Sequence, residues 1–444
     1  MPEKQYKTTN IVLKKKNHKL LQYCFENAQL AKLFRNAVIY RCRQLYFAYK
    51  KSYQNLTQQE QDTLDEFAVI GVTFPLNNKY QYLPGYAVFD AMFKATNNPD
   101  YYNSLPMQTN QQILKKVLKD FKSYDKALKA YYKNPNKFTG KPKLPHYVKG
   151  NVTTLIITNQ GAVIKKNNTL KLPKTKCTVS LGNLQIGKLK EVEIKPFYDT
   201  YKICLVEELE QIQPSALNEN RILGIDLGVN NIVSTSNNCG LTPFVINGNG
   251  VKAYNQWYNK TLAQLRSQLP LNQYSSNRMM LLNKKHHNKT TDFYNKCASY
   301  LINYCFDNNI GTIVIGKNDN WKNESNMGKI NNQKFCFIAH SLLIKKIAEL
   351  AEKAGIHVHI IEESYTSKAS FLDHDDIPVY EKDKQYTFSG KRVHRGLYKT
   401  KTGILINADV NGASNIIRKM IPSAFDNVND FRYLYKTTEK VTII

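Results

Sequence analysis

"RILGIDLGVNNIVSTSNNCGLTPFVINGNG", residues 221–250, is the stretch that decides the fold. Its beginning, Ile222 to Leu227, predicts an apolar strand that carries one acid, Asp226, and Gly228 predicts a tight turn directly after that strand. "NIVSTS" and "PFVINGN" then predict a second and a third strand. A carboxylate within a buried strand is costly unless it binds a cation or accepts hydrogen bonds. We therefore expect Asp226 to meet a cation or hydrogen-bond donors at the end of its strand.

The order strand, acid, turn, strand, strand is the opening of the RNase H-like fold, in which the aspartate of the first strand bridges two divalent metals. Sugar-kinase and actin-like ATPases share the strand–Asp–Gly opening, and an aspartate that only caps a buried turn fits the same pattern. This stretch alone therefore leaves a nuclease, an ATPase and a structural aspartate open.

A second acid, Asp409, lies in "GILINADVNGASNIIRKMI", residues 403–421, at the start of a helical pattern. Aspartate is common as a helix N-cap, and it is also a frequent metal ligand. The two interpretations are compatible, because a helix that begins beside the sheet presents Asp409 to the same site as Asp226. Asn411 and Asn415 lie near Asp409 in the sequence, and we expect them to orient ligands or backbone.

Two further strands are predicted between these acids. "IGTIVIG" (310–316) and "IHVHIIEE" (356–363) flank a helical pattern over residues 339–355, which Gly355 ends. A strand, a helix and a strand in this order predict a crossover that places two parallel strands side by side.

The third carboxylate is the unusual feature of this sequence. Two-metal cleavage of phosphodiesters needs about three carboxylates, yet the first of these strands ends at Gly316, and the second ends in Glu362 and Glu363. Because parallel strands bring their carboxyl ends together, we predict that the third acid has moved to the second strand and that Gly316 keeps the vacated space open. Alternation does not distinguish Glu362 from Glu363, and surface charges at a strand end are the alternative for both.

The composition indicates a nucleic-acid partner. The 444 residues include 63 Lys and Arg against 35 Asp and Glu, a formal net charge of +28, and a polyanion would relieve the self-repulsion. An anionic membrane is the lesser alternative. The eight cysteines form no CxxC pair, which predicts no zinc ribbon and suits a reducing cytosol. With no signal-peptide core and no run of about 18 apolar residues, we expect a cytoplasmic protein without a membrane partner.

Residues from about 20 to 135 have a helical pattern, and one predicted helix has two distinct faces. Its apolar stripe consists of Ile113, Val117, Phe121, Tyr124, Leu128 and Tyr131. Its basic stripe, called the lysine stripe below, consists of Lys115, Lys119, Lys122, Lys126, Lys129 and Lys133. No Glu four residues before a Lys relieves the repulsion along this stripe. We therefore predict that the stripe contacts phosphates, with a solvated surface as the alternative.

Residues 150–210 alternate between apolar and polar side chains and contain Gly/Asn turns, which predicts short strands. The preceding segment, residues 134–150, contains three prolines that predict a stiff, basic connector. Lys141 and Lys143 in this connector are candidate nucleic-acid contacts.

From about residue 30 to 420 the chain resembles the TnpB family of transposon-encoded RNA-guided nucleases, relatives of the type V CRISPR effectors. The matching stretches are "FTGKPKLPHY", "GIDLGVNNIVSTS", "IVIGKNDNWKNESNMGKINNQKF", "EESYTSKASFLD", "FSGKRVHRGLY" and "INADVNGASNIIRK". Asp226 matches the first RuvC aspartate of the family, and Asp409 matches the last.

The resemblance implies a multidomain α+β fold: a RuvC/RNase H-like α/β domain, an N-terminal helical lobe and a β-barrel wedge domain. Residues 1–25 and 150–215 would form the wedge domain, residues 26–149 the helical recognition lobe, and residues 216–444 the nuclease domain. Within that last domain, residues 364–405 would form an inserted, cysteine-free loop that resembles a zinc ribbon and binds nucleic acid.

The resemblance also implies an activity and its partners. These are a guide RNA made from the end of the transposon, cleavage of double-stranded DNA beside a short adjacent motif, and Mg²⁺ or Mn²⁺ as the cofactor. It implies a prokaryotic, nucleoid-associated protein, which we expect to be a monomer or homodimer.

Two departures from the family pattern matter. Many members have a glutamate where this chain has Gly316; a subgroup with the glycine carries the "EESYTSK" glutamates, and we favour Glu363 as the relocated acid and third metal ligand. Many members also have a four-cysteine zinc ribbon, whereas residues 364–405 contain no cysteine. We predict that this loop folds without zinc and contacts nucleic acid through Lys391, Arg392 and Arg395.

Two functions agree with these residues. The first is an active RNA-guided DNA endonuclease with Asp226, Glu363 and Asp409 as catalytic residues. The second is a nuclease-dead RNA-guided DNA-binding protein that represses transcription. The retained carboxylates favour the first. A transposase that joins DNA strands on the same fold is a weaker third alternative.

Overall fold

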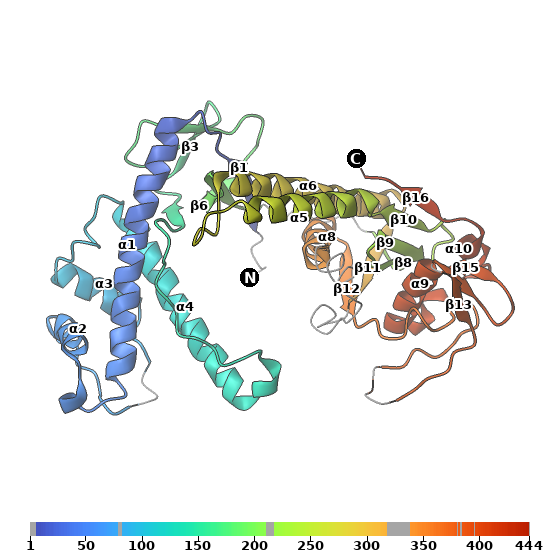
Figure 1. The fold of residues 1–444 in the computed structure, drawn as a ribbon, viewed down its shortest axis with the longest axis horizontal. Coiled ribbons are helices and arrows are strands. Elements are labelled where there is room, and N and C mark those ends of the chain that lie inside the picture. The colour runs from blue at the N-terminus through green and yellow to red at the C-terminus, as the bar shows by residue number, and fades with distance from the viewer. Residues whose placement is uncertain are drawn as a thin grey trace. The chain divides into compact units, whose positions relative to one another are not determined.

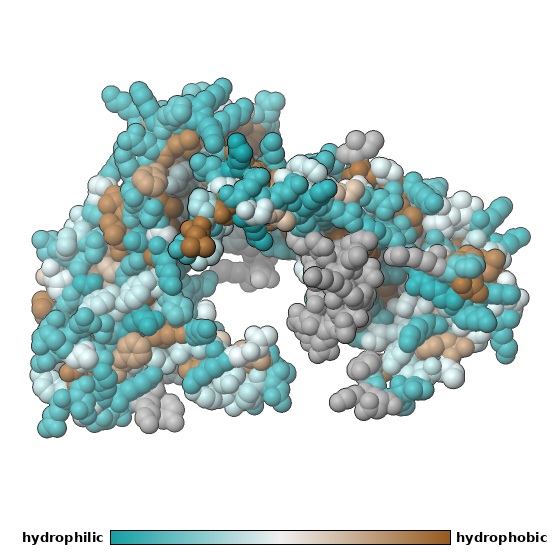
Figure 2. Space-filling view, viewed as in Figure 1, coloured by the Kyte–Doolittle hydropathy of each residue, from teal (hydrophilic) through white to brown (hydrophobic). Residues whose placement is uncertain are grey.

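The computed structural model describes residues 6–78, 82–209, 217–317, 338–379, 381, 384–394 and 396–443. These residues form two compact units, one within residues 1–212 and one within residues 213–444 (Figure 1). Hydrophilic residues cover most of the visible face of both units (Figure 2). Among the described residues, no helix combines the length and the apolar character that a membrane crossing requires.

Helices dominate the first part of the first unit. They are α1 (His18–Ala48), α2 (Gln58–Ala68), α3 (Tyr86–Ala95) and α4 (Met107–Lys133), with single turns of 3-10 helix at Tyr53–Asn55 and Pro135–Lys137. Their shared core is aromatic: Phe34 packs edge-on against Phe93, and Phe67 packs edge-on against Phe89. Helix α2 begins with a capping box between Thr57 and Glu60. The predicted helical region is confirmed.

Helix α4 carries the two stripes that the sequence predicted. Ile113, Val117 and Phe121 are buried, whereas the rest of the apolar stripe is only partly buried, so the stripe meets the core over its first half. All six lysines of the lysine stripe are exposed.

The strands of the first unit form two antiparallel sheets. One has the order β1-β7-β6-β2, from β1 (Tyr6–Val12), β2 (Leu155–Thr158), β6 (Lys188–Phe197) and β7 (Thr200–Glu208). The other consists of β3 (Val163–Lys165), β4 (Thr169–Lys171) and β5 (Thr178–Ser180). The pairing of β1 with β7 joins the two chain segments that were expected to share the wedge domain. Closure of these strands into a barrel stays a prediction.

A six-stranded mixed sheet forms the centre of the second unit. Its order is β12-β11-β8-β9-β10-β16, with β8 (Asn218–Asp226), β9 (Asn231–Asn237), β10 (Phe244–Asn247), β11 (Ile310–Gly316), β12 (His357–Ile361) and β16 (Glu439–Val441). Strands β8, β9 and β10 form an antiparallel meander. Strand β11 pairs in parallel with both β8 and β12. The structure confirms the three predicted strands and the crossover.

Helices cover both faces of this sheet (Figure 1). Leu223 and Ile313 pack on one face with residues of α6 (Asn277–Asp307) and α8 (His340–Ala354). Ile222 and Val314 pack on the other face with residues of α9 (Ala408–Met420). Because strand side chains alternate, the even-numbered residues from Ile222 to Asp226 of β8 and from Thr312 to Gly316 of β11 face α9.

The remaining elements of the second unit are two helices, a turn of 3-10 helix and a small sheet. Helix α5 (Asn249–Ser267) precedes α6, and α10 (Arg432–Lys436) follows α9 after a turn of 3-10 helix at Pro422–Phe425. A small antiparallel sheet of β13 (Lys391–His394), β14 (Leu397–Lys399) and β15 (Leu405–Asn407) leads directly into α9.

Candidate active site

Asp226, Glu363 and Asp409 come from three neighbouring elements of the second unit. Asp226 is the last residue of β8, Glu363 follows β12 by two residues, and Asp409 is the second residue of α9. Strand β11 separates β8 from β12, and the parallel pairing aligns the carboxyl ends of the three strands. The fold therefore gathers at one edge of the sheet the acids that the sequence singled out.

Glycines let α9 and the carboxylates approach the sheet closely. A Cβ atom added to Gly224 of β8 would lie 2.5 Å from the carbonyl oxygen of Ala413. A Cβ atom added to Gly412 of α9 would lie 2.8 Å from Oδ2 of Asp226. Asp226 therefore lies directly against the backbone of α9, on the α9 face of the sheet.

Neighbouring side chains likewise leave no room for a side chain at Gly316. A Cβ atom added there would lie 2.8 Å from Oε2 of Glu363 and 2.5 Å from Cδ1 of Ile416. The Glu363 carboxylate thus occupies the space in which a side chain at residue 316 would begin. This geometry agrees with the predicted relocation of the acid by one strand, whereas a role for Glu363 as a metal ligand stays a prediction.

Glu363 and Glu362 differ in the face of the sheet that they occupy and in their hydrogen-bond partners. Ile361 pairs with Gly316, which faces α9, so Glu363, two residues after Ile361, keeps to the α9 face. Glu362 accepts hydrogen bonds of 2.7 Å from Nζ of Lys419 and of 2.7 Å from the backbone N–H of Ser364. Burial alone would raise the pKa of Glu362, but these hydrogen bonds lower it. Glu362 is therefore the member of the pair that forms a surface ion pair.

Two buried asparagines of α9 hold the chain that follows Glu363. Asn411 donates to the carbonyl oxygen of Ala369 at 2.8 Å and accepts from the N–H of Phe371 at 3.0 Å. Asn415 donates to the carbonyl oxygens of Thr366 and Ala369. Thr366 in turn donates through Oγ1 to the carbonyl oxygen of Glu363 at 2.8 Å. The expectation that Asn411 and Asn415 orient the backbone is confirmed.

Asp409 is not the N-cap of α9. Asn407 has that role, since its side chain accepts from the N–H groups of Asp409 and Val410. This arrangement leaves the Asp409 carboxylate available to side chains: Oδ2 accepts from Asn231 at 2.9 Å, and Oδ1 accepts from Arg392 at 3.2 Å. The N-cap interpretation of Asp409 is therefore wrong, while its position in the first turn of a helix beside the sheet is confirmed.

The electrostatics of the site oppose the ionised states of Asp226 and Glu363. Burial, followed by the charges of Glu363 and Asp409, raises the pKa of Asp226 well above its usual range, although the Arg392 guanidinium partly offsets this rise. Burial and the neighbouring charge of Glu362 raise the pKa of Glu363 to about 7. A divalent cation between these carboxylates would favour their ionised forms.

These three carboxylates are the hard oxygen ligands that Mg²⁺ and Mn²⁺ prefer, so the donor set fits such a cation. Within the described residues, however, no group of three or more His, Cys, Asp or Glu side chains is arranged so that it could already hold a metal ion. Asp409 contacts Arg392 and Asn231 instead. Binding a cation would therefore require these side chains to rearrange.

The inserted loop, residues 364–405, is held together by hydrogen bonds to two of its acids, Asp373 and Asp375. Asp373 accepts from Oγ of Ser370 at 2.6 Å and from the N–H of Lys401 at 2.8 Å. Asp375 accepts from Oγ of Ser389 at 2.6 Å. These bonds join parts of the loop that are up to 28 residues apart in the sequence, and folding without zinc stays a prediction. Lys391 and Arg392 are exposed on β13, and Arg395 lies outside the described residues.

Two residues that contact Asp409 were not predicted to do so. Asn231 was not among the predicted site residues, and Arg392 was predicted only to contact nucleic acid. Asn231 begins β9 directly after the turn at Gly228, where a Cβ atom would lie 2.6 Å from the Asn231 carbonyl oxygen. Nε2 of His340 bonds the carbonyl oxygen of Gly228 at 2.9 Å and fixes this turn further. The predicted tight turn is confirmed, but nothing in the sequence pattern links Asn231 or Arg392 to Asp409.

Two family models match parts of this chain. Residues 204–322 match the OrfB_IS605 family, described as a probable transposase, and residues 340–416 match the TNB domain of the Cas12f1-like proteins. A comparison with the curated proteins gives no match.

Solved structures of RNA-guided proteins are also similar to this chain. A Cas12f1–sgRNA–target DNA complex is 14% identical with a TM-score of 0.33, and the match covers 93% of this chain and 98% of that one. The mini-RNA-guided endonuclease CRISPR-Cas_phi3 is 12% identical with a TM-score of 0.44, and the match covers 94% of this chain and 92% of that one. Asp226 lies within the range that is similar to the OrfB_IS605 transposases, and Glu363 and Asp409 lie within the range that is similar to the Cas12f1-like TNB domain.

Proposed function

We propose that this protein is a transposon-associated RNA-guided DNA endonuclease that hydrolyses phosphodiester bonds at Asp226, Glu363 and Asp409. The observation that carries this proposal is the position of the Glu363 carboxylate, which lies in the space above Gly316 and acts electrostatically on Asp226. The similarity of the surrounding residues to the OrfB_IS605 and Cas12f1-like models supports it.

In this proposal the three carboxylates hold Mg²⁺ or Mn²⁺. Such cations supply charge stabilisation at the phosphoryl group and activate the attacking water. The chain contributes the geometry: Gly412 and Gly316 give the carboxylates room, and Asn415 fixes the chain behind Glu363. Asn231 orients the carboxylate of Asp409.

The net charge of +28 supports nucleic-acid partners, and so does the similarity to the OrfB_IS605 and Cas12f1-like family models. A guide RNA from the transposon end would direct the protein to double-stranded DNA beside a short adjacent motif. We assign phosphate contacts to the lysine stripe and to further exposed cations of the connector and the inserted loop, namely Lys141, Lys143, Lys391 and Arg392, together with Arg395.

One observation favours a second candidate, a nuclease-dead RNA-guided DNA-binding protein that represses transcription. The acids are not arranged as a metal site among the described residues, and Arg392 neutralises Asp409. An inactive descendant would bind guide RNA and target DNA in the same way but would leave the DNA intact.

The deciding experiment begins with sequencing of the RNA that copurifies with the protein. The reconstituted complex is then incubated with matched and mismatched double-stranded DNA in Mg²⁺ or in EDTA. We expect a structured RNA with a variable end and cleavage only of matched DNA in Mg²⁺. Binding of matched DNA without cleavage would favour the repressor, and cleavage by an Asp226→Asn variant at the wild-type rate would overturn the assigned site.

A further inference from the structure

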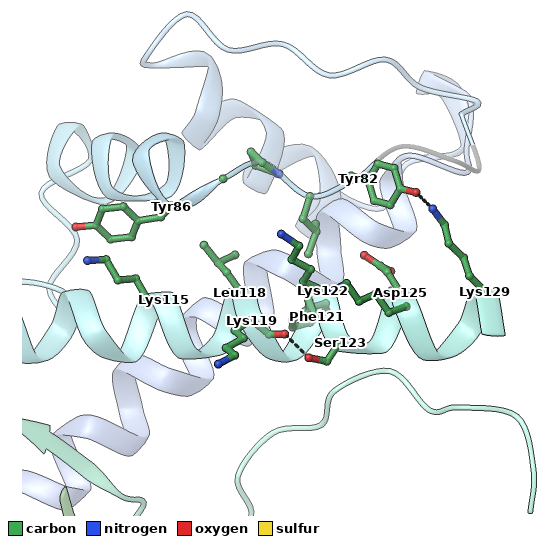
Figure 3. A pocket seen from close by; sticks show the side chains of 14 residues that line it. Tyr82, Tyr86, Lys115, Leu118, Lys119, Phe121, Lys122, Ser123, Asp125 and Lys129 are labelled. Atoms are coloured by element: carbon green, nitrogen blue, oxygen red, sulfur yellow. Dashed lines mark hydrogen bonds between the residues drawn. The ribbon is translucent and has the colours of Figure 1, made fainter. Parts of the chain in front are cut away.

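A cavity of about 900 Å³ lies in the first unit, between α4 and the segment that precedes α3 (Figure 3). Pockets that enclose drug-sized ligands range from about 300 to 1,000 Å³, so this one has room for a nucleotide. Its lining consists of Tyr82, Leu83, Pro84, Gly85, Tyr86, Lys115, Leu118, Lys119, Phe121, Lys122, Ser123, Asp125, Lys126 and Lys129.

The lining is strongly cationic. It contains five lysines of the lysine stripe and one acid, Asp125. In Figure 3, Lys122 and Lys129 extend toward the segment with Tyr82, whereas Lys119 points away from it. Five like charges around one cavity repel one another, and a phosphate among them would remove part of that repulsion.

Tyrosine rings lie at opposite ends of the same cavity. Nζ of Lys129 is 4.7 Å from the centre of the Tyr82 ring, and Nζ of Lys115 is 4.6 Å from the centre of the Tyr86 ring. Tyr82 is 53% exposed, so its ring is accessible to a ligand. Aromatic rings next to cations are the combination that binds unpaired bases together with their phosphates.

Apolar side chains complete the site. Leu118 and Leu83 are only partly buried, and Phe121 forms part of the core beneath them. A base within a duplex has both faces covered by its neighbours, so only an unpaired base can place its face against such a surface.

We propose that this cavity binds one unpaired nucleotide of a nucleic-acid strand that runs along α4. The base stacks on Tyr82, its phosphate contacts Lys122 and Lys129, and Asp125 accepts a hydrogen bond from an amino group of the base. This site lies in the first unit and does not depend on cleavage at Asp226.

The chain contains a matched control for Tyr82. Tyr132 is 63% exposed, and Nζ of Lys141 lies 5.4 Å from the centre of its ring, but Tyr132 does not line the cavity. The two tyrosines therefore share exposure and a neighbouring cation and differ in their access to the cavity.

The test uses the full chain, freed of copurified RNA, in EDTA so that cleavage does not occur. The probes are ten-nucleotide single strands of RNA and of DNA with one 2-aminopurine, whose fluorescence falls when it stacks on an aromatic ring. We expect quenching with the wild-type protein and with the Tyr82→Phe and Tyr132→Ala variants. We expect Tyr82→Ala to bind about 5- to 150-fold more weakly and without quenching.

Quenching by RNA alone or by DNA alone identifies the strand that supplies the nucleotide, and both results support the site. Equal affinities of Tyr82→Ala and Tyr132→Ala would overturn the proposal. If the Tyr82→Ala change weakened binding of the same sequence within a duplex as much as it weakened binding of the single strand, the requirement for an unpaired base would be overturned. Circular dichroism of each variant separates a loss of binding from a loss of folding.

Discussion

The acidic site and the lysine stripe differ in how their charged side chains are surrounded: the acids lie against other elements, and the lysines are exposed. Asp226 and Glu363 lie against α9, next to Gly412 and Gly316, and buried asparagines of α9 bond the backbone that follows Glu363. The lysines of α4 are exposed along one helix face. Ligands of a catalytic cation must be placed within a fraction of an ångström, whereas phosphates respond mainly to the number of nearby charges. We therefore expect loss of function to be all-or-none at the acids and graded at the lysines.

The largest effect should follow Asp226→Ala or Glu363→Ala. Loss of a cation ligand removes several kcal/mol of transition-state stabilisation, about a 1,000-fold loss of cleavage rate or more, while guide RNA and target binding persist. Single-turnover cleavage and filter binding measure the two effects. Glu362→Ala, which removes the ion pair with Lys419 and the hydrogen bond from the N–H of Ser364, is the matched control and should cut normally. If Glu363→Ala were fully active and Glu362→Ala inactive, Glu362 would be the cation ligand in place of Glu363. If the variant with both changes were active, neither glutamate would be a cation ligand, and the prediction of a relocated acid would be wrong.

The next effect should appear at the lysines and should be additive. Lys122→Gln, Lys126→Gln and Lys129→Gln together should lower the slope of log affinity against log salt by about 2, at about 0.7 for each single-strand phosphate contact. Each single variant should lower it by about a third of that amount. Titrations at several salt concentrations measure the slopes. An unchanged slope would mean that the lysine stripe is a solvated surface without phosphate contacts. A complete loss of binding in a single variant would contradict the expectation that loss of function at the lysines is graded.

Stability in EDTA should decrease as the pH rises from about 4.5 to about 7. Glu363 has its pKa raised to about 7 in the folded state, and an unfolded Glu titrates near about 4.3. At Glu363 the folded state therefore binds more protons in this window, so the contribution of this residue to the free energy of unfolding falls with pH by about 3 kcal/mol. The raised pKa of Asp226 acts in the same direction. Denaturant titrations at several pH values measure this decrease, and Glu363→Gln should flatten it. An equally steep decrease in that variant would assign the effect to other groups.

A smaller effect is expected from returning the acid to β11. Gly316→Glu with Glu363→Ala should restore part of the lost cleavage, because the new side chain enters the space that the Glu363 carboxylate leaves. Ile416 obstructs this change, since its Cδ1 would lie 2.5 Å from the added Cβ atom. Adding Ile416→Val should therefore increase the rescue. Gly316→Ala alone should lower the free energy of unfolding by about 1–3 kcal/mol through overpacking, and a neutral Gly316→Ala would contradict the close contact.

The smallest expected change is at the inserted loop. Removal of zinc with a chelator should leave stability and cleavage in Mg²⁺ unchanged, because Asp373 and Asp375 tie the loop through hydrogen bonds. Metal analysis of the purified protein is the direct measurement. One equivalent of zinc per chain would overturn the zinc-free loop and would agree with a metal site in the region that matches the TNB domain model.

The sequence predicted those parts of the site that depend on local pattern. The strand that ends at Asp226 and the parallel pair β11 and β12 follow from periodicity and crossover rules. The choice between Glu362 and Glu363 did not follow, because it depends on which face of the sheet α9 covers, and α9 begins more than 40 residues later. The contact of Arg392 with Asp409 likewise requires the small sheet to fold back on the first turn of α9.

The apolar stripe of α4 shows the same limit. The spacing alone predicted one continuous buried face, yet full burial ends at Phe121, and Tyr124 beyond it makes only a partly buried contact with Tyr46 of α1. Tertiary neighbours, which local pattern does not specify, decide where a helix face is covered.

The pairing of β1 with β7 has a consequence for synthesis of the chain. Val12 pairs with Lys202, so the first strand is synthesised 190 residues before its partner. At about 5–20 residues per second, that interval is about 10–40 s. During this time β1 exposes unpaired backbone, and its polar sequence "YKTTNIV" makes it a poor template for pairing with other chains. The four-stranded sheet is thus completed late, when folding of the helices between its strands can already be under way.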